Sequence, residues 1–108
     1  MKLQNKVAII TGGGKGIGAE ISLRLAKEGA KIVIAEKDIE SAENIKKKII
    51  ENKGDAIVVD TNVANEDSVN QMAEAAIKKF GKIDILINNA GIRPVSYTHL
   101  RAHETYDH

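Results

Sequence analysis

Four short apolar runs alternate with three longer amphipathic segments, and this alternation constrains the fold more than any other feature of the 108-residue sequence. The runs are rich in β-branched residues and have the length of strands that are buried on both faces. They are Val7–Ile10, Ile32–Ala35, Ala56–Val59 and Ile83–Ile87. Strands that alternate with helices favour an α/β fold with a parallel sheet.

The segments between the strands have helical periodicity. They run from about 17 to 28, from about 39 to 52, and from a predicted N-cap at Asn65 to Phe80. In the first, Ile17, Ile21 and Leu25 share one face. Glycine ends a helix at little steric cost, and this predicts that the helices stop at Gly29, Gly54 and Gly81.

The predicted order β-α-β-α-β-α-β, with right-handed crossovers, gives a doubly wound parallel sheet of strand order 3-2-1-4. A flavodoxin-like sheet is the alternative topology. Because the pattern stops after the fourth strand, we expect that strand to form an edge of the sheet.

A glycine-rich turn, TGGGKGIG, joins the first strand to the first helix. We expect Gly12 to make the sharp exit from the strand, Gly16 to let a backbone approach a pyrophosphate, and Gly18 to pack the helix close to the sheet. Free N–H groups and the helix dipole would then face the phosphates. Lys15 precedes a glycine rather than Ser or Thr, which excludes a P-loop.

Glu36 follows the second strand, at the place where a dinucleotide-binding fold needs an acid for the adenosine ribose. The same carboxylate would repel a 2′-phosphate. Lys15 and Lys37 could instead pair with that phosphate, or could be solvated surface charges. We favour NAD over NADP because a carboxylate both binds the diol and excludes the phosphate.

Asp60 ends the third predicted strand, and Asn88-Asn89-Ala90-Gly91 follows the fourth. In open parallel sheets, ligands bind at the carboxyl ends of the strands, where the strand order reverses. The sequence therefore predicts that these residues lie at one ligand-binding edge. The Asn-Asn-Ala-Gly segment alone would also suit an ordinary turn.

These motifs together resemble the short-chain dehydrogenase/reductase family, over the stretch from Lys6 to Ile92. The resemblance implies a Rossmann-type fold and an NAD(P) cofactor. It also implies a set of cofactor-binding residues: Gly12, Gly14, Lys15, Gly16, Ile17 and Gly18 at the pyrophosphate, Glu36 at the ribose, Asp60 and Thr61 at the adenine, and Asn88, Ala90 and Gly91 along the cofactor channel.

The family's hydride transfer depends on a serine and a Tyr-x-x-x-Lys pair far beyond the Asn-Asn-Ala-Gly segment. The tail offers Ser96, Tyr97 and Arg101, but this serine is misplaced and arginine cannot give up its proton as lysine does. We therefore assign no catalytic residue. The sequence predicts an inactive part of an NAD(P)-dependent alcohol/carbonyl oxidoreductase, similar to 3-oxoacyl-thioester reductases or to sugar or steroid alcohol dehydrogenases.

The tail at 94–108 differs in composition from the rest of the chain. His99 and His103 have helical metal-ligand spacing, but no fold fixes them, so no metal site is predicted. Val95–Thr105 resembles the in-frame translation of a transposon-type sequencing adapter. We therefore expect a partial NAD(P)-binding Rossmann domain at 1–93 and a non-native tail at 94–108.

Composition excludes several classes of partner. The formal net charge is +1, with acids and bases interleaved, which gives no footprint for nucleic acid. No stretch is long and apolar enough for a membrane span or a signal peptide, and the chain has no cysteine. We expect a cytoplasmic protein with a small-molecule substrate, whose parent forms homotetramers or homodimers. A non-catalytic dinucleotide-binding module or redox sensor is the alternative function.

Overall fold

The computed structural model describes residues 2–89, which form four strands and three helices. In chain order, these are β1 Val7–Thr11, α1 Gly16–Lys27, β2 Lys31–Glu36, α2 Ile39–Glu51, β3 Asp55–Asp60, α3 Glu66–Phe80 and β4 Ile85–Asn88. The predicted alternation is confirmed, and most boundaries differ from the prediction by one or two residues. Ala90, Gly91 and the tail at 94–108 lie outside the described residues.

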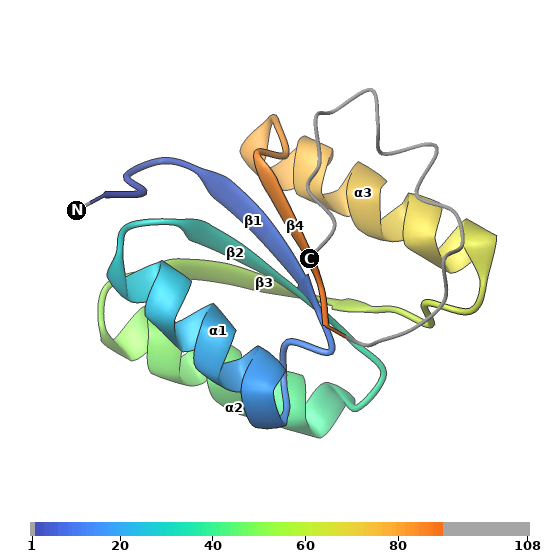
Figure 1. Ribbon diagram of the computed structural model, residues 1–108, viewed down its shortest axis with the longest axis horizontal. Coiled ribbons are helices and arrows are strands. Elements are labelled where there is room, and N and C mark those ends of the chain that lie inside the picture. The colour runs from blue at the N-terminus through green and yellow to red at the C-terminus, as the bar shows by residue number, and fades with distance from the viewer. Residues whose placement is uncertain (1, 90–108) are drawn as a thin grey trace.

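The strands form one parallel sheet in the order β3-β2-β1-β4, as predicted. Ile9 of β1 is in register with Val33 on one side and with Leu86 on the other. Since β1 is central, the order of strands reverses beside it. α1 and α2 cover one face of the sheet, and α3 lies on the other (Figure 1).

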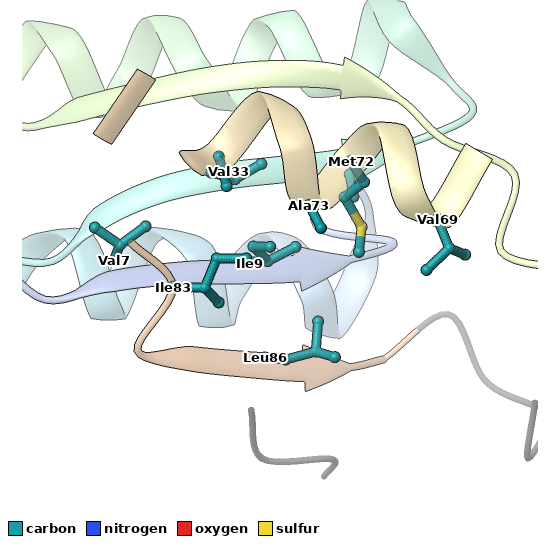
Figure 2. Close-up of a cluster of buried hydrophobic side chains, with 10 residues drawn as sticks. Val7, Ile9, Val33, Val69, Met72, Ala73, Ile83 and Leu86 are labelled. Carbon is teal, nitrogen blue, oxygen red and sulfur yellow. The ribbon is translucent and has the colours of Figure 1, made fainter. Parts of the chain in front are cut away.

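Each face of the sheet has its own apolar core. Toward α1 and α2, strand residues such as Ile10 and Ile32 pack with Ala42, Ile45 and Ile49 of α2. Toward α3, the buried strand residues Val7, Ile9, Val33 and Leu86 meet Val69, Met72 and Ala73 of the helix (Figure 2). The two inner strands are buried almost throughout, whereas β3 and β4, at the edges of the sheet, are largely half-buried.

Two local predictions are wrong. Ile17 is 71% exposed, and the fully buried positions of α1 are Gly18 and Ser22, because the helix lies closest to the sheet through its small residues. The left-handed residue after α2 is Lys53, at φ +67°, rather than Gly54. A side chain at Gly54 would instead crowd Ile49.

One further boundary differs from the prediction. Ile83 lies before β4 but is still buried against the α3 face, so its apolar character reflects packing rather than strand pairing.

Candidate functional site

The carboxyl ends of all four strands meet at one edge of the sheet. This edge carries the glycine turn after β1, Glu36 at the end of β2, Asp60 and Thr61 at the end of β3, and Asn88 at the end of β4. The structure thus brings together the predicted site residues that fall within the described part of the chain. Ala90 and Gly91 do not fall within it.

The glycine turn needs its glycines for two different reasons. Gly12 and Gly16 have φ values of +66° and +52°, in the left-handed region that side chains disfavour. A Cβ at Gly18 would overlap the Gly12 carbonyl oxygen and come within 2.6 Å of the Asn89 amide nitrogen. A Cβ at Gly16 would meet no atom of residues 2–89 within 4 Å, so the described part of the chain leaves the space in front of that residue open.

Ser22 holds the turn in place from inside α1. Its buried hydroxyl lies 3.0 Å from the carbonyl oxygen of Gly13 and 2.9 Å from that of Gly18, and can donate to either. Sequence reasoning missed this residue. The available signal was a small polar side chain one helical turn after Gly18, on the face that packs against the glycine turn.

The amino terminus of α1 has no side-chain cap. Lys15 occupies the N-cap position in an extended conformation, and its carbonyl oxygen accepts the first helical bond from Ala19 at 3.1 Å. No acidic residue lies in the first turn. The first N–H groups of a helix lack intrahelical acceptors and carry a partial positive charge. The open space at Gly16 therefore adjoins a positive helix terminus.

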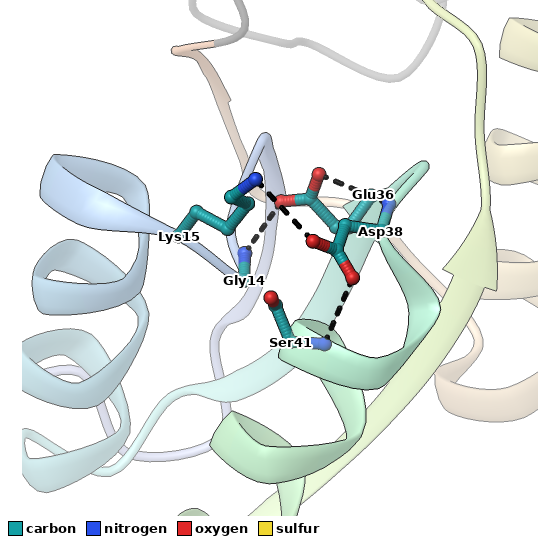
Figure 3. A network of polar contacts seen from close by, with 5 residues as sticks. All are labelled: Gly14, Lys15, Glu36, Asp38 and Ser41. Atoms are coloured by element: carbon teal, nitrogen blue, oxygen red, sulfur yellow. Dashed lines mark hydrogen bonds and ion pairs between the residues drawn. The ribbon is translucent and has the colours of Figure 1, made fainter.

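Glu36 connects the glycine turn to the turn after β2 (Figure 3). Glu36 is 9% exposed and is buried between the two turns. Its Oε1 accepts a hydrogen bond from the Gly14 N–H at 3.0 Å, and its Oε2 accepts one from the Asp38 N–H at 3.3 Å. Each carboxylate oxygen can accept a second hydrogen bond, so Glu36 still has capacity for a ligand hydroxyl.

Lys15 and Asp38 form a second connection between the same two turns. The Lys15 Nζ lies 3.3 Å from the Asp38 Oδ2 (Figure 3). Asp38 is also the N-cap of α2, where its Oδ1 accepts from the Ser41 N–H at 3.2 Å. The Ser41 backbone N–H, with the Ser41 hydroxyl and Lys15, lowers the pKa of Asp38 below its ordinary value. Asp38 is not among the residues predicted from the sequence to bind the cofactor.

The remaining strand ends are fixed by hydrogen bonds. Thr61 is buried, its hydroxyl donates to the Val59 carbonyl at 2.9 Å, and its N–H donates to the Glu36 carbonyl at 3.3 Å. Asp60 beside it is exposed. At the β1–β4 junction, the Thr11 hydroxyl lies 3.3 Å from the Asn88 Oδ1. These contacts leave Asp60 as the solvent-facing polar group at the end of β3.

The asparagine after β4 also contacts the glycine turn. The Asn89 side-chain amide donates to the Gly12 carbonyl at 3.4 Å, close to the upper limit for a hydrogen bond. The contact joins the end of the fourth strand to the start of the turn. The edge is therefore connected through side chains from β4 across to α2.

A hollow of about 720 Å³ lies at the opposite edge of the sheet. Leu23, Ala26 and Ile49 line it, together with residues at the ends of α1 and α2. None of the predicted site residues contributes to it. Helix carboxyl ends present carbonyl oxygens, so this hollow lacks the free backbone N–H donors found where the strands end, although Lys27, Lys31, Lys48 and Lys53 line it.

No helix within residues 2–89 is both long and apolar enough to cross a membrane. The same residues contain no group of three side chains placed to hold a metal ion.

Comparison with known proteins gives relatives along most of the chain. An uncharacterised oxidoreductase of Listeria monocytogenes is 43% identical over 96 residues, which cover 89% of this chain and 39% of the relative. A 3-oxoacyl-[acyl-carrier-protein] reductase of Synechocystis is 43% identical over 91 residues, 83% of this chain and 37% of the relative. The chain thus spans less than half the length of these curated relatives.

Solved structures also match this chain along most of its length. A metagenomic short-chain oxidoreductase in complex with NADP superposes with a TM-score of 0.80 at 30% identity, over 85% of this chain and 42% of that one. A 7α-hydroxysteroid dehydrogenase with NADH and a 7-oxo bile acid gives 0.79 at 33% identity, over 93% of this chain and 41% of that one. The family profile described as short chain dehydrogenase matches residues 6–108. With this match added to the Rossmann-type sheet and its glycine turn, the chain belongs to the short-chain dehydrogenase family.

Proposed function

We propose that this chain carries the dinucleotide-binding part of an NAD(P)-dependent oxidoreductase that interconverts an alcohol and a carbonyl. One observation carries the proposal: the uncapped amino terminus of α1 opens onto free space at Gly16, inside a turn held by buried contacts. Backbone N–H groups at such a terminus suit a pyrophosphate. The exposed apolar side chain of Ile17, at the same terminus, would be covered by a bound dinucleotide.

The residues of this edge would divide the cofactor between them. Gly16, Ile17 and Gly18 would present N–H groups to the pyrophosphate. Gly12 and Gly14 would shape the turn, because the Gly14 N–H already bonds to Glu36 and a side chain there would crowd Ala42.

The other groups would hold the two ends of the cofactor. Glu36 would accept hydrogen bonds from the adenosine ribose, and the exposed Asp60 with Thr61 would adjoin the adenine. Asn88, with Ala90 and Gly91, would line the channel toward the nicotinamide, which supplies or accepts the hydride.

The buried carboxylate of Glu36 favours NAD over NADP. It is fixed by two backbone N–H donors, so it cannot swing away from a 2′-phosphate placed beside it. Repulsion between the two anions would weaken binding of the phosphorylated cofactor.

The residues that would bind the substrate lie, on this proposal, in the part of the relatives that this chain does not span. Relatives of both the 3-oxoacyl reductase and the hydroxysteroid dehydrogenase types match it, so the substrate class is proposed as an alcohol/carbonyl pair. The resemblance places the serine and Tyr-x-x-x-Lys beyond Gly91. We therefore propose that the 108-residue chain alone binds a cofactor without turning over a substrate.

Cofactor binding by the chain tests the proposal, with NADH and NADPH titrated by calorimetry. Gly16→Ala would place a methyl group in the open space before the helix terminus, and we expect a loss of affinity of about tenfold or more. Gly81→Ala is the matched control, because Gly81 has φ +85° and open space around its Cβ but lies at the far end of α3. Equal losses in the two variants, or no binding by the unaltered chain, would contradict the proposal.

Sequencing the genomic locus beyond codon 93 tests whether the parent protein carries the catalytic residues and whether the tail at 94–108 is native. We expect codons for the natural continuation in place of the tail at 94–108, followed by the serine and the Tyr-x-x-x-Lys pair. A continuation without that pair would favour the non-catalytic binding module or redox sensor. A locus that encodes the tail as printed would overturn its adapter origin.

A further inference from the structure

We propose that Asp38 is a specificity-determining residue, which holds the Lys15 ammonium away from the ribose 2′ position and so favours a dinucleotide with a free 2′-hydroxyl. The inference rests on the proposed function and assigns a role to a residue outside the predicted cofactor-binding set. Its basis is the ion pair between Lys15 Nζ and Asp38 Oδ2, which joins the glycine turn to the turn after β2.

Lys15 would otherwise act against Glu36. It is the basic residue of the TGGGKGIG turn, and its side chain is 63% exposed, so the ammonium can reach several positions around the turn. Glu36 lies two residues before Asp38 and bonds to Gly14, the neighbour of Lys15. A free ammonium at this place could pair with a 2′-phosphate that Glu36 repels, and the two residues would then select opposite cofactors.

Asp38 is the better anchored partner of the pair. Its Oδ1 accepts the Ser41 N–H as the N-cap of α2, while its own N–H donates to Glu36. Lys15 occupies the N-cap position of α1, but its side chain makes no capping hydrogen bond there. The carboxylate therefore fixes where the ammonium lies (Figure 3). With Lys15 neutralised in this way, the carboxylates of Glu36 and Asp38 leave this corner of the site unfavourable for a second phosphate.

Asp38→Asn separates the ion pair from the helix cap. Asparagine caps a helix as well as aspartate does, so α2 keeps its start while Lys15 loses its partner. We expect the variant to bind NADPH about threefold to tenfold more tightly, in keeping with the modest strength of exposed ion pairs, and to bind NADH within about twofold of the unaltered chain.

A double-mutant cycle with Lys15→Met gives the decisive comparison. If Asp38 acts through Lys15, Asp38→Asn will raise NADPH affinity only while Lys15 is present. Glu40→Gln is the matched control, since it removes one negative charge from the first turn of the same helix without touching the ion pair. It should change the NADPH-to-NADH affinity ratio by less than about twofold.

The outcomes separate this inference from the proposed function. An unaltered chain that binds NADH, with an affinity ratio unmoved by Asp38→Asn, overturns the role of Asp38 and leaves the function standing. An equal shift with Glu40→Gln, or a shift that persists in the Lys15→Met background, also overturns it. A chain that binds neither NADH nor NADPH overturns both proposals.

Discussion

The start of α1 differs from the starts of α2 and α3. Asp38 and Asn65 cap the two later helices, accepting hydrogen bonds from the backbone N–H groups of Ser41 and Ser68. Glu40 in α2, and Glu66 with Asp67 in α3, add negative charge in the first turn. α1 has Lys15 at its N-cap position and no acid in its first turn.

The difference shows that one fold can begin its helices in two ways. A side-chain cap satisfies one of the free N–H groups and places a polar side chain where a ligand would otherwise approach. At α1 the glycine turn is instead held by tertiary contacts from Ser22, Glu36 and Asn89, so the helix start keeps its donors available.

Gly18→Ala should have the largest effect, because the new methyl group overlaps the Gly12 carbonyl and forces α1 away from the sheet. We expect the free energy of unfolding to fall by about 3 kcal/mol. Urea denaturation followed by circular dichroism measures the loss. In Gly16→Ala the new methyl group meets no atom of residues 2–89, so the variant adds only the strain of a left-handed alanine. Its free energy of unfolding should fall by about 1 kcal/mol. Similar losses in both variants would show that α1 does not depend on this close approach.

Ser22→Ala should destabilise the chain by about 1–2 kcal/mol, because the Gly13 carbonyl in the glycine turn loses the hydroxyl donor of Ser22. The measurement is again the free energy of unfolding. Ser68→Ala is the control: its hydroxyl accepts from the exposed Asn62 N–H, which water can satisfy, so a loss of only about 0.5 kcal/mol or less is expected. If Ser22→Ala is as mild as the control, the turn is held by other contacts.

Asn65→Ala should cost about 1 kcal/mol, since α3 loses the side chain that accepts from Ser68. Asn65→Asp should be neutral because aspartate is an equally good cap. Lys15→Ala at the equivalent position of α1 should change stability by no more than about 0.5 kcal/mol, because Lys15 contributes no cap there. Thermal or urea unfolding of the three variants measures these differences in stability. A large loss of stability in Lys15→Ala would show that α1 depends on its N-cap residue as much as α3 does.

Acidification should weaken the start of α2 but not that of α1. This should be the smallest of the expected effects on stability. The pKa of Asp38 is lowered in the folded state by the Ser41 N–H, the Ser41 hydroxyl and Lys15. A lowered folded pKa gives stability that is present above the ordinary value of 3.8 and is lost as the pH falls through the folded value. The Ser41 amide resonance, followed by NMR during acidification, should shift below about pH 4. Asp38→Asn should abolish that shift, and an unchanged shift would assign the titration to another group.

Much of the site was predictable because it depends on local sequence patterns. The alternation of apolar runs and helical segments predicted the strand order, and parallel strands place their carboxyl ends at one edge. The positions of the glycine turn, Glu36, Asp60 and Asn88 followed directly. The exposure of Ile17 was not predictable in this way, because helical spacing shows which residues share a face but not which part of that face the sheet covers.

The sequence by itself determined the order of the elements and the edge at which polar residues gather, since hydrophobic periodicity and chain connectivity are sufficient for both. Tertiary structure decided the partners at that edge. The Gly14–Glu36 bond spans 22 residues, and the Lys15–Asp38 pair joins the same two turns. Such contacts depend on how closely two turns approach and on the rotamers of their side chains, which no local pattern in the chain encodes.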